Sequence, residues 1–377
     1  MMSYSARAGY PGTTDCITVV VIGPFPPPMH GMANVTAIMT EQLRSRCNIH
    51  VNNISPGVLT RGLGYHLVKA TRVCLAALSL LRNAAAKNAT LYIPADAGLG
   101  TYYTTLFVIL ARMFRYRIFI HHHGFVYIDK RVPRMALLAK CAGSEAVHIF
   151  LCSRMERCYR ELYPWARQYL LLSNAWNFFP ADSPPARPDS FLVMGHLSNL
   201  GPEKGFYDVL DTLRAMTARK KRVRLILAGP PTTPEVRKNI EAAMKEFGDA
   251  LDYRGPAFGA DKDKFYRDID VFLFPSQNEG QPLVLFEAMS QGVPSICYAR
   301  GCMADDLGEG GGFAAPVESN FVDYALPILT DWEGNPSGLR EARTSSLARA
   351  HLLRAQASAE LQTVVNQIAA KNQASQS

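Results

Sequence analysis

Short apolar runs alternate with amphipathic stretches along this chain, and the alternation limits the fold more than any other feature. The runs of the first series are 17–22, 49–52, 90–93, 117–121, 147–152 and 168–172. Between them, stretches such as 34–45 and 66–86 carry apolar residues at spacings of three and four, which is the helical period. Runs without polar alternation are typical of strands buried on both faces of a parallel sheet. The pattern therefore predicts a doubly wound α/β domain.

A proline-rich segment, 179–189 (FPADSPPARPD), interrupts this alternation and reads as a linker. Beyond it the pattern restarts, with apolar runs and helical stretches at 191–194, 206–219, 224–228, 234–247, 271–274, 282–291 and 295–298. A chain of 377 residues is also long enough for two domains. We therefore expect an N-terminal domain at 1–182, a C-terminal domain at 183–349 and a cleft between them. A helix near 350–377 is expected to pack back on the first domain.

The stretch NEGQPLVLFEAM, residues 278–289, follows a buried run of the second series. Ligands of such sheets bind beyond the carboxyl ends of the strands. Pro282 is suited to the first helical position, so the amides around Gln281, Leu283 and Val284 are expected to form a phosphate-binding helix N-terminus. Glu279 and Glu287, on either side, would accept hydrogen bonds from sugar or ribose hydroxyls. An acid/base pair, a metal site and a solvated helix edge remain open from spacing alone.

The longer stretch PSQNEGQPLVLFEAMSQGVPSI resembles the signature of family 4 glycosyltransferases, which have the GT-B fold of two Rossmann-like domains facing a central cleft. The loop GHLSNLGPEKG, at 195–205, is similar to the family loop that ends in Lys-Gly. The resemblance implies that Glu279 binds the donor sugar, Glu287 the ribose and Lys204 the diphosphate. Where the family often has an arginine this chain has His196, so Lys204 is expected to carry more of the phosphate charge, with help from Lys262 or Lys264.

In the first half, GPFPPPMHGMANV resembles the glycine-containing first loop of the family, with Gly31 at its tight point and His30 in place of a second glycine. The stretch HHHGF matches a His-Gly element of the family and nominates His123 as the residue facing the transferred sugar. His121 and His123 share one face of an extended strand, so a metal pair is an alternative. No third ligand stands nearby in the sequence, and a core or donor-contact histidine is favoured.

The resemblance implies a retaining transfer of a sugar from a UDP-sugar or GDP-mannose to a hydroxyl, without metal or other cofactor. The residues expected to take part in catalysis are His123, Lys204 and Glu279. Those expected to bind the donor are Gly31, His196, Lys204, Gln281, Leu283, Val284 and Glu287. A non-catalytic nucleotide- or glycan-binding relative, a sugar-nucleotide epimerase and a phosphorylase are the alternatives.

Charge is unevenly distributed along the chain. Residues 1–180 hold 19 Lys and Arg against 7 Asp and Glu, whereas 181–377 hold 21 against 25. The basic half suggests an anionic partner. With the resemblance, this favours a lipid-linked glycan acceptor of envelope or exopolysaccharide synthesis, reached from an anionic membrane. The stretch 66–87 fits either a helix on that membrane or an ordinary helix packed on the sheet. Basic patches without interleaved aromatics or a known module argue against nucleic acid.

The N-terminus lacks the apolar segment of a signal peptide, and the apolar run 104–111 is too short to span a bilayer. We therefore expect a cytoplasmic protein, peripheral at most on the inner face of the cytoplasmic membrane. Its eight cysteines show no CxxC pair, which favours reduced thiols over disulfides; they are Cys16, Cys47, Cys74, Cys141, Cys152, Cys158, Cys297 and Cys302.

Overall fold

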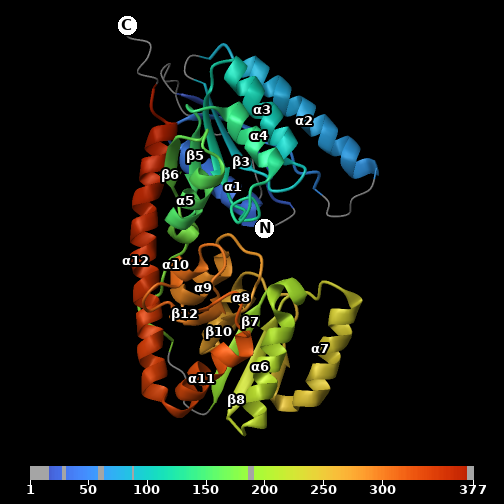
Figure 1. Cartoon of the computed structure of the whole chain (residues 1–377), viewed down its shortest axis with the longest axis vertical. Coiled ribbons are helices and arrows are strands. Elements are labelled where there is room, and N and C mark those ends of the chain that lie inside the picture. Colours follow the sequence, from blue (N-terminus) through green and yellow to red (C-terminus); the bar gives the residue numbers. More distant parts are fainter. Residues whose placement is uncertain (1–16, 28–30, 58–62, 87–88, 186–190, 372–377) are drawn as a thin grey trace.

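The computed structural model describes residues 17–27, 31–57, 63–86, 89–185 and 191–371. Two six-stranded parallel sheets, each covered by helices, lie one above the other along the long axis of the molecule (Figure 1). The expected α/β fold of two doubly wound domains is therefore confirmed. His30, Lys87 and residues 186–190 of the expected linker lie outside the described residues.

The first sheet has the strand order β2-β1-β3-β4-β5-β6. Its strands are β1 (Thr18–Gly23), β2 (Asn48–Asn53), β3 (Thr90–Ala95), β4 (Arg117–His122), β5 (Val147–Phe150) and β6 (Gln168–Leu171). Its helices are α1 (Gly31–Arg44), α2 (Leu63–Asn83), α3 (Thr101–Met113), α4 (Pro133–Ala142) and α5 (Ser153–Leu162), followed by the 3-10 turn η1 (Asn174–Asn177). The residues of β1, β3 and β5 are all buried, as expected from runs without polar alternation.

The second sheet has the strand order β12-β11-β10-β7-β8-β9. Its strands are β7 (Leu192–Leu197), β8 (Val223–Ala228), β9 (Leu251–Tyr253), β10 (Val271–Phe274), β11 (Ser295–Tyr298) and β12 (Gly312–Ala315). Its helices and 3-10 turns are η2 (Pro202–Lys204), α6 (Phe206–Ala218), α7 (Pro234–Phe247), η3 (Gly248–Ala250), α8 (Ala260–Arg267), α9 (Leu283–Ser290), α10 (Met303–Leu307) and α11 (Phe321–Gly334). In both sheets the order reverses beside the first strand, and ligands of such folds bind at that point.

A single long helix, α12 (Pro336–Ile368), runs along both domains (Figure 1). Its first half packs near α9, and Leu361, Val365 and Ile368 join the apolar core beneath β1. Its end is also held by polar contacts, because Arg117 donates hydrogen bonds to the carbonyls of Gln367 (2.8 Å) and Ala370 (2.5 Å). The helix therefore ties the second domain back to the first.

Five of the histidines in the described residues are fully or largely enclosed in the two domains, and burial lowers their pKa values. The pKa of His123 and that of His196 fall to about 4 and that of His148 to about 3. The pKa values of His121 and His122 are also lowered well below the ordinary value, by burial first and by neighbouring histidines second. His122 and His148 hydrogen-bond each other at 2.9 Å. These side chains are therefore neutral in the folded protein at neutral pH.

The buried histidines predict loss of stability in mild acid. Unfolded histidine has a pKa of about 6.5, so the unfolded chain binds protons first, and the free energy of unfolding falls as pH drops from about 6.5 toward about 4. Asp306 opposes this, because burial raises its pKa to about 8. Burial also raises the pKa values of Asp208 and Glu360, but we expect the five histidines to outweigh these three carboxyls. We expect the Tm to fall by about 5 °C or more between pH 7.5 and pH 5.

Thermal unfolding across that pH range measures the effect. His148→Phe should make the dependence shallower, whereas His66→Phe, at an exposed position of α2, serves as the matched control and should leave it unchanged. A Tm that does not change between pH 7.5 and pH 5 would contradict the prediction.

Candidate active site

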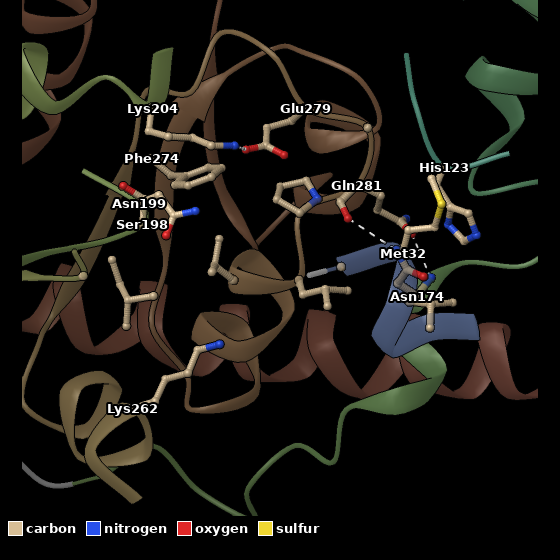
Figure 2. Close-up of a pocket in the computed structure, with 18 of the residues that line it drawn as sticks. Met32, His123, Asn174, Ser198, Asn199, Lys204, Lys262, Phe274, Glu279 and Gln281 are labelled. Carbon is tan, nitrogen blue, oxygen red and sulfur yellow. Dashed lines mark hydrogen bonds and ion pairs between the residues drawn. The ribbon is translucent and has the colours of Figure 1, made fainter. Parts of the chain in front are cut away.

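A cavity of about 440 Å³ lies between the two domains, beyond the carboxyl ends of strands from both sheets. The first domain contributes Gly31, Met32 and His123, and the second contributes Ser198, Lys204 and Glu279 among others. Figure 2 shows Lys204 and Glu279 pointing toward each other on one wall, with Met32 and His123 on another. Residues far apart in the sequence thus meet at one ligand-sized space.

Lys204 and Glu279 form an ion pair on the cavity wall. Glu279 also accepts a hydrogen bond of 3.0 Å from the hydroxyl of Ser276. Gly205 makes this arrangement possible: its φ is +75°, and a Cβ there would lie 2.4 Å from the carbonyl oxygen of Pro275. A side chain at position 205 would therefore push η2, which carries Lys204, away from the loop after β10.

The N-terminus of α9 faces the same cavity. The helix begins at Leu283 and its N-cap is Pro282 in an extended conformation, one residue later than the sequence predicted. Leu283 and Val284 both line the cavity, and the first N–H groups of a helix have no intrahelical acceptor. This end of α9 can therefore hold an anion such as phosphate.

Glu287 lies one turn further along α9 and does not line this cavity. Its carboxylate pairs with the Lys262 ammonium at 2.6 Å and accepts a hydrogen bond from the Tyr266 hydroxyl at 2.9 Å. Lys262 itself lines the cavity, whereas Lys264 lines a separate cavity of about 250 Å³. Of the two helper lysines considered from the sequence, the structure brings only Lys262 to the site.

His196 is not brought into the cavity. Its side chain is buried in β7, where Nδ1 donates to the carbonyl of Leu273 at 2.8 Å and Nε2 contacts the hydroxyl of Ser198 at 2.8 Å. Both ring nitrogens are thus engaged within the protein. Side chains alternate between the two faces of a strand, and that of His196 is on the face that does not line the cavity. Its effect on a ligand is indirect, through Ser198, which does line the cavity.

His123 and Gly31 reach the cavity from the first domain, after β4 and at the start of α1. The His123 ring lies against that of His121, with centroids 4.1 Å apart, and the Tyr92 hydroxyl hydrogen-bonds Nδ1 of His121 at 2.7 Å. Across the cleft, a Cβ on Gly280 would lie 2.5 Å from the carbonyl oxygen of His123. Glycine at 280 therefore lets the Glu279 loop approach the His123 loop closely.

Gln281 lines the cavity but its side chain is committed to the contact between domains. Its carbonyl oxygen accepts from the amide of Asn174 at 2.7 Å, and its NH₂ group donates to Ser173 at 3.0 Å and to Asp306 at 2.8 Å. The side chain is also buried. Gln281 thus positions the Glu279 loop against the first domain, and the sequence pattern alone did not indicate this.

A disulfide joins Cys152, at the start of α5, to Cys302, at the start of α10. The expectation of reduced thiols throughout is therefore wrong for this pair. The two residues are 150 positions apart, so their spacing in the sequence does not indicate a disulfide. Their Cα atoms lie 6.1 Å apart because the two domains pack against each other at this point. Next to the bridge, the amide of Cys302 donates to the carbonyl of Gly280 at 2.8 Å.

Ser198, Asn199 and Asn174 also line the cavity, although none of them was among the residues expected to bind the donor or take part in catalysis. Their positions on loops after β7 and β6 were the available signal, because such loops face the ligand in doubly wound folds. Within the described ranges, no group of three or more His, Cys, Asp or Glu side chains is arranged to hold a metal ion.

The family model described as "Glycosyl transferases group 1" matches residues 188–331, which contain Lys204, Glu279 and Glu287. Residues 188–331 therefore form a glycosyltransferase group 1 domain. Since the matched segment begins just before β7 and ends within α11, it holds one wall of the cavity, and the first domain supplies the other.

Solved structures share the fold of this chain at low sequence identity. Anabaena HepE in complex with UDP is 16% identical, with a TM-score of 0.67, over 93% of this chain and 99% of that chain. Sucrose-phosphate synthase from Thermosynechococcus elongatus is 16% identical, with a TM-score of 0.70, over 93% and 98%. The pneumococcal O-GlcNAc transferase GtfA in complex with UDP and GlcNAc is 14% identical, with a TM-score of 0.60, over 78% and 59%.

These matches confirm the GT-B fold of the chain. The comparison with curated proteins finds no match. In the described part of the chain, no helix is both long and apolar enough to cross a membrane.

Proposed function

We propose that the protein transfers a sugar, with retention of anomeric configuration, from a nucleotide diphosphate donor to a hydroxyl of a lipid-linked glycan. The observation that carries this proposal is the Lys204–Glu279 pair beside the N-terminus of α9. A cation and helix amides can bind the diphosphate, and a carboxylate next to them can bind hydroxyls of the sugar. HepE and GtfA, which share the fold, have solved structures with UDP, so a UDP-sugar is the first donor to test and GDP-mannose the second.

In the proposed reaction, the bond between the anomeric carbon and the leaving phosphate oxygen breaks, and its electron pair goes to the diphosphate. The acceptor oxygen forms the new bond on the same face, and its proton passes to the leaving phosphate oxygen. Lys204 and the amides of Leu283 and Val284 stabilise the charge that develops on the diphosphate. Glu279 orients the sugar, and no acid or base role is assigned to it.

Binding of the donor would change the partners of both glutamates. A diphosphate oxygen would take the place of Glu279 beside Lys204, which frees Glu279 for a sugar hydroxyl. Glu287 would bind the ribose once Lys262 turns away from it, and Lys262 would then add a second cation near the phosphates. His123, Gly31 and Met32 would meet the sugar and acceptor from the first domain when the cleft closes.

The acceptor side of the proposal rests on the basic first half of the chain. We propose a lipid-linked glycan of envelope or exopolysaccharide biosynthesis, glycosylated at the inner face of the cytoplasmic membrane. No nucleic acid and no metal cofactor are assigned to the reaction.

The test is a donor panel. Purified protein is incubated with UDP-glucose, UDP-galactose, UDP-N-acetylglucosamine or GDP-mannose, with and without lipid-linked acceptors, and release of the nucleotide is measured. We expect release with one donor to rise when the right acceptor is added, and NMR of the product to show the donor's anomeric configuration. Tight UDP binding without turnover on any donor would favour a binding protein, and isomerised donor without acceptor would favour an epimerase.

A further inference from the structure

Helix α2 exposes a row of large apolar side chains on its outward face. Val73, Ala76 and Leu80 point inward and are buried. On the other side of the helix, the outward row consists of Leu67, Val68, Leu75, Leu78 and Leu81, of which Leu67 is 70% and Leu75 57% exposed. The outward face of a surface helix is normally polar, so this row indicates a further contact.

Helix α3 continues the same surface. Its inward residues Phe107, Val108 and Ala111 are buried, while Leu99 just before it and Tyr102, Tyr103, Leu106, Ile109 and Met113 are exposed. The two helices lie side by side (Figure 1), and the Lys69 ammonium of α2 lies 5.8 Å from the centroid of the Tyr103 ring of α3. We call the eleven exposed residues of these two rows the α2–α3 face. A surface of this kind marks an interaction site.

The charges around the α2–α3 face are almost entirely positive. Helices α2 and α3 carry Lys69, Arg72, Arg82 and Arg112 and no acidic residue, Arg115 follows α3, and Asp96 lies just before α3. Arg82 and Arg115, at the ends of the two helices, are exposed, and Asp96 accepts a hydrogen bond from the amide of Gly98 at 2.9 Å. Apolar side chains surrounded by cations fit an anionic lipid surface, where both contribute to binding. A second copy of the chain would instead bring like charges together.

The position of the α2–α3 face relative to the cleft fits the same partner. Leu99 and Tyr102 follow the carboxyl end of β3, and α2 likewise follows that of β2. The active-site cavity lies at this same edge of the first sheet. One end of the face therefore lies at the side of the first domain on which the cleft opens, where an acceptor held in a bilayer would reach His123.

We propose that the α2–α3 face docks onto an anionic phospholipid bilayer, with its apolar row inserted among the acyl chains near the headgroups. This inference deepens the proposed function, because a lipid-linked acceptor would then enter the cleft from the membrane that holds the enzyme. Membrane docking is measured without any sugar donor, so its failure would leave the proposed transferase activity untouched. Likewise, a failure of the transferase proposal would leave the docking result untouched.

Co-sedimentation of the full chain with vesicles tests the docking. The vesicles are phosphatidylcholine alone or phosphatidylcholine with one third phosphatidylglycerol, at low and high salt. We expect binding to the anionic vesicles that weakens with salt. Removing two charges with Arg82→Gln and Arg115→Gln should weaken it about 25-fold, since each basic residue contributes about fivefold. Replacing two apolar side chains with Leu75→Ser and Leu78→Ser should weaken it at least tenfold.

Matched controls lie on exposed helices outside the face. Arg237→Gln with Lys238→Gln, on α7, removes the same charge, and Met244→Ser with Leu352→Ser removes two apolar side chains that are 43% and 48% exposed. Both controls should bind vesicles like the unaltered chain. Circular dichroism and UDP affinity verify that each variant is folded.

Equal sedimentation with neutral and anionic vesicles, or equal binding by the face variants and the controls, would overturn the proposal. So would light scattering that shows a dimer of the unaltered chain which Leu75→Ser with Leu78→Ser makes monomeric, because the occupant would then be a second copy.

Discussion

Replacing Glu279 with alanine is expected to lower kcat/KM for sugar transfer by about 10²- to 10³-fold. In the structure its carboxylate lies on the cavity wall, held by Lys204 and by the Ser276 hydroxyl. Without it the sugar would lose the contact that orients its reactive carbon. Initial rates of nucleotide release, with the best donor of the panel and its acceptor, measure the loss.

The affinity for UDP alone gives a second readout for the Glu279→Ala variant. Because Glu279 competes with phosphate for Lys204, UDP should bind the variant as tightly as the parent, or more tightly. Glu203→Ala is the matched control, since this glutamate precedes Lys204 and is exposed, and its transfer rate should not change. An unaltered transfer rate in Glu279→Ala would contradict the proposal that Glu279 orients the donor sugar.

The second large effect is expected from Lys204→Ala, which should raise the Kd for UDP by about 10- to 100-fold, because a hydrogen bond to a charged group contributes about 1.5–3 kcal/mol. The same change should lower kcat, since the ammonium also stabilises the leaving diphosphate. Calorimetry with UDP and single-turnover kinetics measure the two parts separately.

Lys264→Ala is the control for Lys204→Ala, because Lys264 has the same charge on the same domain but lines a different cavity. Its UDP affinity should match that of the parent. Combining Lys204→Ala with Glu279→Ala should give less than the product of the single effects, as expected for residues in direct contact. If Lys204→Ala left UDP affinity unchanged, the phosphate site would lie elsewhere.

The sheets were predictable because their strands are buried on both faces and read as unbroken apolar runs. Lys204 and Glu279 were predictable for a related reason: both lie on loops that follow such strands, where a parallel sheet binds its ligands. Their meeting depends on one local feature, the positive φ of Gly205, and the Lys-Gly pair in the sequence carried that signal.

The roles of other site residues could not be predicted from the sequence, because they depend on tertiary contacts. His196 has the right place in the sequence for a donor contact, but the alternation of β7 turns its ring inward, where Leu273 and Ser198 hold it. Gln281 received a donor role from its position, whereas its side chain bonds to Asn174 of the other domain. Cysteine spacing does not indicate a bridge between residues 150 positions apart.

The disulfide between Cys152 and Cys302 also restricts how the cleft can move. It lies beside the contact between Gly280 and the His123 loop, so the two domains are fastened close to the reacting end of the cavity. Opening must then be a rotation about that fastening, which acts as a pivot. Such a rotation would keep the Glu279 loop next to the His123 loop, and the parts of the second domain farther from the bridge would move most. The enzyme can therefore admit a bulky nucleotide at the far end without dismantling the geometry at the end where the sugar is transferred.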